Sequence, residues 1–433
     1  MVTAHDQIEH ASMTDVGMRR SHNQDRHAVL LASDAQQWQD RGHVFLVADG
    51  MGGHAVGEMA ADMAGDIIPH IYHKHAHQGP DIALRTAILE ANASIHARGQ
   101  QNREFEGMGT TATALLIRPE GAWVAHVGDS RTYRVRPDKI EQLTFDHSWL
   151  WELARRQGVE PETLKHVPSN RILRCLGSDP LVQVDIDGPY PLEEGDIFVV
   201  CSDGLSGQVP DEEIGAAANA LPPAEACEFL THLANLRGGP DNITTIIVRV
   251  NRSRDEAAVS APVGRPARPW HQTVPWQLLS LLLGLLLASF ALLLSITDRR
   301  YVGFVFVLAA TSLLVGLVGL AVMYFSDPGP RKDRPRRGRP KVYRQRSCAV
   351  TRSMLDKLIE SSATLQALVR DRNWHADWDT YSRHADRAER CLRQNDLSSA
   401  YREYCLAIRP LTEAFHTYCH RGDSFKPLWE TPA

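Results

Sequence analysis

The sequence is poor in the features that mark secreted, disulfide-linked or zinc-dependent proteins. Its seven cysteines are scattered and form no Cys-x-x-Cys pair, which favours buried thiols in a reducing compartment over disulfides or structural zinc. The N-terminal stretch MVTAHDQIEHASMTD is polar and has no apolar core, so no signal peptide is expected. The formal net charge is only −5 in 433 residues, and this near balance argues against nucleic acid as the main partner.

The part of the chain up to residue 252 alternates short β-rich runs with stretches of helical spacing. The runs are rich in Val, Ile, Thr and aromatic residues, as strands with a buried face require. Between them, apolar residues recur at the spacing of amphipathic helices. We therefore predict an α+β domain over residues 1–252, with strands near 43–50, 111–118, 122–136, 195–204 and 242–250.

Two long apolar runs without a charged residue follow a Pro- and Arg-containing linker at 253–275. They cover residues 276–296 and 301–325, and each is long enough to cross a hydrocarbon core of about 30 Å as a helix. Only residues 297–300 separate them. We predict a two-helix transmembrane hairpin over 276–325; the alternative is a buried helical pair in a soluble protein.

Basic residues flank the predicted hairpin on both sides. Residues 326–346 contain the run RKDRPRRGRPKVYRQR, and several arginines precede the first apolar run. Because cytoplasmic flanks carry an excess of Lys and Arg, we expect a multi-pass protein of the cytoplasmic membrane with both termini in the cytoplasm. The basic segment either also contacts anionic membrane lipids or serves as a topology signal alone.

The C-terminal part, residues 347–433, carries apolar residues at helical spacing and predicts an all-α domain. The stretch 387–415 resembles a single helix-turn-helix repeat of the tetratricopeptide kind, but a single unit is weak evidence, and a generic helical bundle is the preferred interpretation. We expect this domain to lie in the cytoplasm and to bind a protein partner that the sequence does not identify.

Five aspartates stand at or near β-rich runs: Asp25, Asp49, Asp129, Asp203 and Asp241. Any one of them next to glycine is most often a turn former. Packed strands bring such positions together, however, and clustered carboxylates must be neutralised by protons, basic side chains or metal ions. Since the ligands are all oxygen, and no nucleophilic Ser or Cys motif competes, the pattern favours Mg²⁺ or Mn²⁺.

The stretch VADGMGGHAVGE, residues 47–58, ends a strand on Asp49 and continues with clustered glycines. Glycine lets a backbone adopt unusual angles or approach another group closely. The carbonyl of Gly50 could therefore complete the coordination of a metal. Two hard cations there would activate a bridging water and clamp the oxygens of an in-line phosphoryl displacement.

Seven motifs, in this order, resemble the metal-dependent protein phosphatase family, protein phosphatase 2C, and above all its bacterial serine/threonine branch: TDVGMRRSHNQD, VADGMGGHAVGE, MGTTAT, VGDSR, LTFDHS, SDG and GPDNIT. The resemblance covers about residues 10–250. It implies an α-β-β-α sandwich with a dinuclear Mn²⁺ or Mg²⁺ centre at one end. Residues 155–170 correspond to the flap, which contacts substrate in relatives.

The resemblance also implies which residues hold the two metals. Asp49 would bridge both ions, and Gly50 would give its carbonyl to one of them. Asp203 and Asp241 would hold the other ion. Asp25 would act mainly through metal-bound water.

Further roles carry over to four other residues of the matching motifs. Asp129 would belong to a third, weaker metal site. Arg20 would bind the substrate phosphate, because a planar guanidinium suits that oxyanion. His54 would protonate the leaving alkoxide, and Asn242 would give local hydrogen-bonding support.

These features together predict a membrane-anchored phosphatase that acts on phosphoserine and phosphothreonine proteins, the products of a serine/threonine kinase. The predicted architecture is an α-β-β-α catalytic domain, a transmembrane hairpin and an all-α C-terminal domain. The alternative is a membrane scaffold or phosphoprotein-binding module, in which the C-terminal domain recruits partners and hydrolysis is secondary or absent.

Overall fold

The structure is a computed structural model of the chain, and it describes residues 7–53, 55–164, 166–168, 171–251, 282–290, 292, 302–325 and 340–419. The chain divides into two compact units. The first comprises residues 1–253 and 339–433, and the second comprises residues 254–338.

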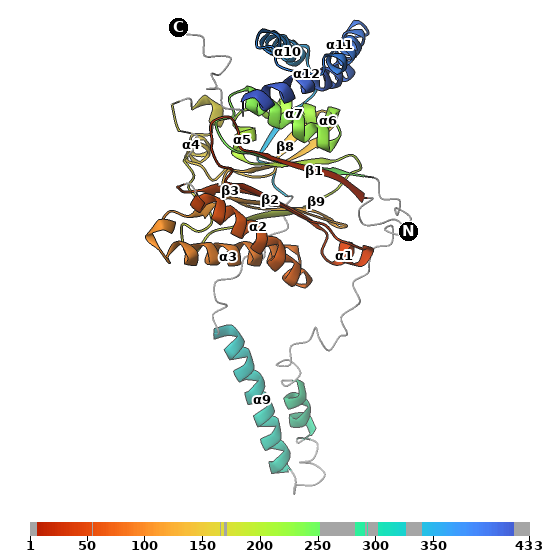
Figure 1. Cartoon of the computed structure of the whole chain (residues 1–433). Coiled ribbons are helices and arrows are strands. Elements are labelled where there is room, and N and C mark those ends of the chain that lie inside the picture. Colours follow the sequence, from red (N-terminus) through yellow and green to blue (C-terminus); the bar gives the residue numbers. More distant parts are fainter. Residues whose placement is uncertain are drawn as a thin grey trace. The chain divides into compact units, whose positions relative to one another are not determined.

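The first unit is built on two antiparallel sheets that pack face to face (Figure 1). Its strands are β1 Ile8–Asp15, β2 Asp25–Leu30, β3 His43–Met51, β4 Gly109–Thr110, β5 Ala112–Arg118, β6 Gly121–Val127, β7 Arg131–Arg136, β8 Lys139–Gln142, β9 Asp185–Tyr190, β10 Ile197–Cys201, β11 Ile243–Val250 and β12 Arg344–Ser347. Sheet A has the order β1-β11-β10-β7-β8-β12. Sheet B has the order β2-β3-β5-β6-β9, with β4 paired to β3.

Helices cover the outer face of each sheet. The helices are α1 Ala35–Asp40, α2 Ala55–His75, α3 Pro80–Gly99, α4 Trp149–Gln157, α5 Asp203–Ser206, α6 Asp211–Ala220, α7 Pro223–Leu236, α10 Arg352–Asp371, α11 Trp378–Arg393 and α12 Leu397–Cys419, with the short 3-10 turns η2 Ala76–Gln78, η3 Arg103–Phe105 and η4 Pro161–Thr163. The pair α2 and α3 lies on sheet B, and α6 and α7 lie on sheet A (Figure 1). This arrangement confirms the predicted α-β-β-α sandwich.

Strand β3 shows how the sequence produces two cores around one sheet. Side chains of a strand alternate between its two faces. Phe45 and Val47 lie in the core between the sheets, whereas Val44 and Leu46 lie in the core under α2 and α3. Because both faces are covered, the strand reads as a continuous apolar run up to Asp49, where it reaches the end of the sandwich.

The C-terminal helices extend the core of the catalytic unit. Helix α12 packs on α6 and α7, and α10 and α11 pack on α12. The apolar side chains Tyr401, Ile408 and Leu411 of α12 share one buried cluster with Leu230 and Leu233 of α7. The prediction that this part of the chain is helical is confirmed, and its core is continuous with that of the sandwich.

The basic run was assigned from the sequence to a juxtamembrane segment, but its last residues form a strand. Strand β12 pairs antiparallel with β8, and Arg344 lies opposite Gln142. Strand β8 would otherwise be the edge of sheet A, and an unpaired edge offers free N–H and C=O groups to a passing segment. The charge of Arg344 is compatible with this position because acidic side chains form ion pairs with it.

Polar contacts join α12 to the sandwich as well. The Oγ1 of Thr412 lies 3.0 Å from Nδ1 of His232, and the Nε2 of His416 lies 2.7 Å from Oδ2 of Asp15. Burial lowers the pKa of His232 to about 4. The charges of His416 and Arg409 act in the same direction, whereas the charge of Asp15 opposes the shift. Burial acts to raise the pKa of Asp15, but hydrogen bonds, first that from His416, outweigh it and hold this pKa well below its usual range.

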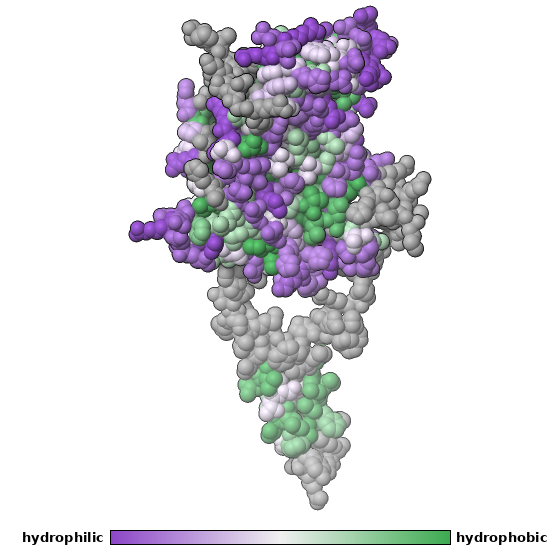
Figure 2. Space-filling view, in the orientation of Figure 1, coloured by the Kyte–Doolittle hydropathy of each residue, from purple (hydrophilic) through white to green (hydrophobic). Residues whose placement is uncertain are grey.

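The second unit contains α9 (Val302–Phe325), and residues 282–290 are also helical. Its described atoms are mostly hydrophobic in Figure 2, and large apolar side chains such as Leu286, Phe304 and Leu314 are exposed. The described residues include no helix that is both long and apolar enough to cross a membrane. The hairpin predicted over 276–325 is therefore not supported; most of its first run, and the side chains at the end of its second, lie outside the described residues.

Candidate active site

The five aspartates singled out in the sequence come from five separate connections at one end of the sandwich. Asp25 begins β2 and lies opposite Asp49 of β3 in the register of sheet B. Asp203 begins α5 directly after β10, Asp129 follows β6, and Asp241 precedes β11. The charges of all the other four act on Asp49, so the sandwich gathers these carboxylates into one cluster.

Burial makes this cluster electrostatically costly. Burial, and then the charges of Asp203 and Asp241, raise the pKa of Asp25 to about 7. Burial and the charge of Asp241 raise the pKa of Asp203 to about 6. The pKa values of Asp49 and Asp129 are held well above their usual range by burial and by the neighbouring carboxylates. Like charges at such short range oppose ionisation, which a nearby cation would reverse.

The donor chemistry of the cluster fits divalent cations that prefer oxygen. Buried oxygens of three aspartates have no hydrogen-bond partner among the described residues: Oδ1 of Asp25, Asp129 and Asp203. Such orphaned anionic oxygens are what a hard cation would satisfy. Within the described ranges, no group of three or more His, Cys, Asp or Glu side chains is already arranged around a metal position. The fit therefore lies in charge and ligand type.

Hydrogen bonds from neighbouring residues orient two of the aspartates. Ser202 donates its hydroxyl to Oδ2 of Asp25 at 2.7 Å. The backbone N–H of Asp49 donates to Oγ1 of Thr111 at 2.9 Å, and the hydroxyl of Thr110 donates to the Asp49 carbonyl at the same distance. The MGTTAT motif thus holds Asp49 in place. The sequence alone does not mark Ser202, because a serine before Asp-Gly is an ordinary helix N-cap; only its position next to Asp203 in the SDG motif hints at the site.

Asn242 ties together the segments around the cluster. Its amide donates to the carbonyls of Val16 and His22, at 2.8 and 3.0 Å, and its Oδ1 accepts the backbone N–H of Gln24 at 2.8 Å. These contacts hold the segment between β1 and β2 against the start of β11. That segment carries Arg20.

Arg20 is a cationic side chain that forms an ion pair with one aspartate of the cluster. Its Nη2 donates to Oδ2 of Asp241 at 2.7 Å, and its side chain is 48% exposed. The hydrogen bond to Asp241, and then the charges of Asp241, Asp49 and Asp203, raise the pKa of Arg20, so the guanidinium stays protonated. An exposed guanidinium at the mouth of a carboxylate cluster can exchange its carboxylate partner for a phosphate.

Close backbone packing explains the glycines after Asp49. A Cβ on Gly50 would lie 2.1 Å from the carbonyl oxygen of Gly57, so no other residue fits. Gly52 has φ of +128°, a conformation that side chains disfavour. The following His54 lies outside the described residues, and its predicted role as a proton donor stays a prediction.

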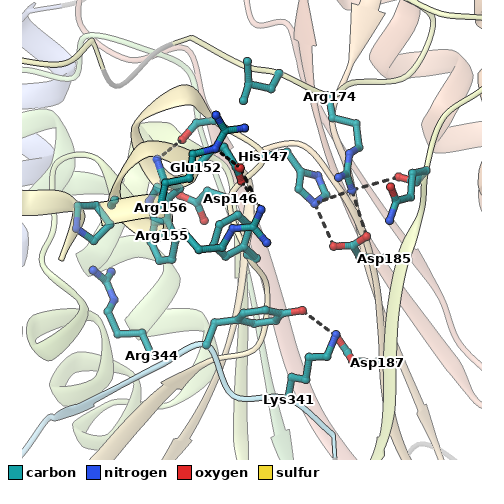
Figure 3. A pocket seen from close by; sticks show the side chains of 18 of the residues that line it. Asp146, His147, Glu152, Arg155, Arg156, Arg174, Asp185, Asp187, Lys341 and Arg344 are labelled. Carbon is teal, nitrogen blue, oxygen red and sulfur yellow. Dashed lines mark hydrogen bonds and ion pairs between the residues drawn. The ribbon is translucent and has the colours of Figure 1, made fainter. Parts of the chain in front are cut away.

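A cavity of about 900 Å³ lies between α4, β9 and the segment that leads into β12 (Figure 3). His147 links the cavity to the cluster, since it exchanges hydrogen bonds with Gly128, the residue before Asp129, at 2.7 and 3.0 Å. On its other side, Nε2 of His147 lies 3.1 Å from Asp185, which also pairs with Arg174 at 3.0 Å. The segment that leads into β12, together with β12 itself, is called the C-terminal segment. It contributes Lys341, Tyr343 and Arg344 to the wall of the cavity.

Comparison with known proteins gives concordant results. Residues 9–150 match the family model of protein phosphatase 2C. The serine/threonine phosphatase stp of Listeria innocua is 34% identical over 246 residues, which cover 55% of this chain and 94% of that protein. Protein phosphatase PhpP of Streptococcus pneumoniae is 34% identical over 266 residues, which cover 58% of this chain and 100% of that protein. The solved structure of the Mycobacterium tuberculosis serine/threonine phosphatase PstP/Ppp matches with a TM-score of 0.50 and 31% identity, over 57% of this chain and 100% of that chain.

Proposed function

Since this chain belongs to the protein phosphatase 2C family and is a serine/threonine protein phosphatase, we propose that it hydrolyses phosphoserine and phosphothreonine side chains with two Mn²⁺ or Mg²⁺ ions held at the aspartate cluster. Phosphatases of this family use divalent metals. The substrates are phosphoproteins made by a serine/threonine kinase. The buried carboxylate cluster with its orphaned oxygens is the observation that carries this proposal.

Each residue of the cluster has a part in holding the ions. Asp49 and the carbonyl of Gly50 would hold the ions directly. Asp203 and Asp241 would add further carboxylate ligands. Asp25, which Ser202 orients, would support the centre, and Asp129 would serve a third, weaker position. When bound, the ions would neutralise the carboxylates, polarise the phosphoryl group and supply an activated water.

The remaining steps belong to Arg20 and His54. Arg20 binds two phosphate oxygens through its planar guanidinium and orients the phosphoryl group for in-line attack. To do so it gives up its contact with Asp241, which frees that carboxylate for a cation. His54 donates a proton to the leaving serine or threonine oxygen, so that a neutral alcohol departs.

Phosphate release from a phosphothreonine peptide by the full-length protein tests this proposal. We expect turnover with Mn²⁺, none with excess chelator, and none for Asp49→Asn or Asp203→Asn. Asp66→Asn is the matched control, because Asp66 is exposed on α2, away from the cluster, and should leave turnover unchanged. Metal-independent turnover, or full activity of both cluster variants, would contradict the metal assignment. A folded protein that binds the metal and the phosphopeptide without turnover would favour the binding-module alternative.

We also propose that the protein is attached to the cytoplasmic membrane through residues 276–325, with both termini in the cytoplasm. The two uncharged apolar runs and the exposed apolar side chains of the second unit support this proposal. The full-length protein should stay with the membrane fraction after an alkaline wash, whereas a variant without 276–325 should not. Recovery of the full-length protein in the soluble fraction would refute the attachment.

A further inference from the structure

Strand β12 brings two arginines of the C-terminal segment to the flap of the phosphatase. Arg344 and Arg346 are two positions apart in the strand, so their side chains point to the same face of the sheet. Arg344 pairs with Glu162 of η4, and Arg346 pairs with Glu160 at 2.7 Å. Glu160 and Glu162 both lie in residues 155–170, the segment that corresponds to the substrate-contacting flap.

Arg344 also has a rigid anchor on the other side of its guanidinium. Its Nη2 lies 2.6 Å from Oδ2 of Asp211, and both side chains are buried, with only 7% and 6% exposed. The other oxygen of Asp211 accepts the hydroxyl of Tyr133 at 2.9 Å and lies 3.6 Å from Arg131. Tyr133 and Arg131 belong to β7 in the middle of sheet A. Asp211 thus fixes one side of the Arg344 guanidinium to sheet A.

An aromatic ring completes the link to the flap. The guanidinium of Arg344 lies 5.2 Å from the ring centre of Trp151 in α4, and Arg131 lies 5.3 Å from the same ring. Helix α4 leads directly into the flap, and it starts at Ser148, which caps it through the N–H of Trp151. A cation over an aromatic face adds attraction beyond the ion pairs. Arg344 therefore contacts Asp211, which is bound to sheet A, the ring of Trp151 in α4, and Glu162 of the flap at once.

We infer that Arg344 is a positioning residue of the phosphatase reaction, through which the C-terminal segment sets the flap in the orientation that holds a phosphoprotein substrate. This inference rests on the proposed function and deepens it, because it names the residue that couples the C-terminal segment to substrate recognition. A phosphoprotein reaches beyond its phosphate onto the flap and the walls of the neighbouring cavity. A small phosphomonoester occupies only the cluster and Arg20, and it does not depend on Arg344.

Two substrates and two variants separate this role from plain stabilisation. The full-length protein is assayed with Mn²⁺ on phosphorylated casein and on p-nitrophenyl phosphate, and its thermal unfolding is followed in parallel. The first variant, Arg344→Gln, removes the contacts of Arg344 with Asp211, Trp151 and Glu162 and leaves the Arg346–Glu160 pair in place. The second, Glu162→Gln, removes only the flap contact of Arg344; the buried guanidinium keeps its ion pair with Asp211, so this change leaves no buried charge unpaired. Arg352→Gln is the matched control, because among the described residues Arg352 forms an ion pair with Asp356 alone, on the surface of α10.

For both variants we expect KM on casein to rise about fivefold, with kcat on casein and both constants on p-nitrophenyl phosphate within about twofold of wild type. The double variant should show no further rise, because both changes break the same link. Casein kinetics like those of wild type in both variants would overturn the inference. Equal losses on both substrates together with a lowered unfolding temperature would also overturn it, since that is the result of stabilisation alone. A wild-type protein inactive on both substrates would instead refute the proposed function.

Discussion

Replacement of Leu411 by alanine tests whether the C-terminal helices and the sandwich form one folding unit. Leu411 lies on α12, is fully buried, and belongs to the apolar cluster that α12 shares with α7 and the outer face of sheet A. A Leu→Ala change removes the transfer free energy of the lost atoms and leaves a cavity, which together cost about 2–5 kcal/mol. We expect about 3 kcal/mol here, or about a 150-fold fall in the ratio of folded to unfolded protein.

Hydrogen exchange followed by mass spectrometry measures this cost separately in each element. Because α7 lies between sheet A and α12, amides of α7 and α12 should lose protection together in Leu411→Ala. Arg402→Ala is the control on the same helix; Arg402 is exposed, so the change should shift protection by no more than about 0.5 kcal/mol. Loss of protection confined to α12, with α7 unchanged, would refute the shared core and leave the C-terminal helices as a separate domain.

Three further predictions concern the site and the α7–α12 contact. Ser202→Ala removes the hydrogen bond that orients Asp25. We expect the affinity for Mn²⁺ to fall about tenfold in a titration of activity against metal, since residues that orient metal ligands have effects of this size. Unchanged affinity would mean that Asp25 needs no orientation. Arg20→Lys keeps the charge but loses the planar fork, so kcat/KM on a phosphopeptide should fall about tenfold; a variant as active as wild type would exclude Arg20 from phosphate binding. His232 has a folded pKa of about 4 against an ordinary 6.5, so protonation favours the unfolded chain and stability should fall by about 3 kcal/mol as pH drops from about 7 to about 4. His232→Gln should lose this part of the pH dependence in urea unfolding at the two pH values, and an identical pH profile would count against burial as the cause.

The catalytic part of the fold was predictable because its pattern is local and repeated. Strands such as 43–50 combine buried apolar runs with an aspartate at the end, and the edge where such runs end is where their carboxylates meet. The pairing of β2 with β3, which places Asp25 opposite Asp49, was not predicted, because β2 was not among the predicted strands. Ser202 could not be identified in the same way, since its value lies in a hydrogen bond to a residue 177 positions away.

The docking of the C-terminal segment was not predictable for a similar reason. Residues 331–346 read as a solvated or lipid-facing basic run, because Arg and Lys are rarely buried without partners. The partners of Arg344 are Asp211 and Glu162. Both lie far from Arg344 in the sequence, and no periodic pattern links them to it. Buried arginines are stable where carboxylates form ion pairs with them, and only the tertiary structure shows which carboxylates these are.

The C-terminal helices also brace the segments that carry Asp241 and Arg20. Helix α7 ends at Leu236, and the turn that follows leads to Asp241; within this turn Gly239 accepts a hydrogen bond from the N–H of Met18 at 2.8 Å. The same end of α7 holds Asp15 through Asn235, and Asp15 in turn accepts the N–H of Gly17 at the start of the segment with Arg20. Because α12 packs on α7 and its His416 pairs with Asp15, the position of α12 bears on both segments. Like charges in a cluster repel one another. The packing of α12 on α7 therefore helps to hold Asp241 close to the other carboxylates.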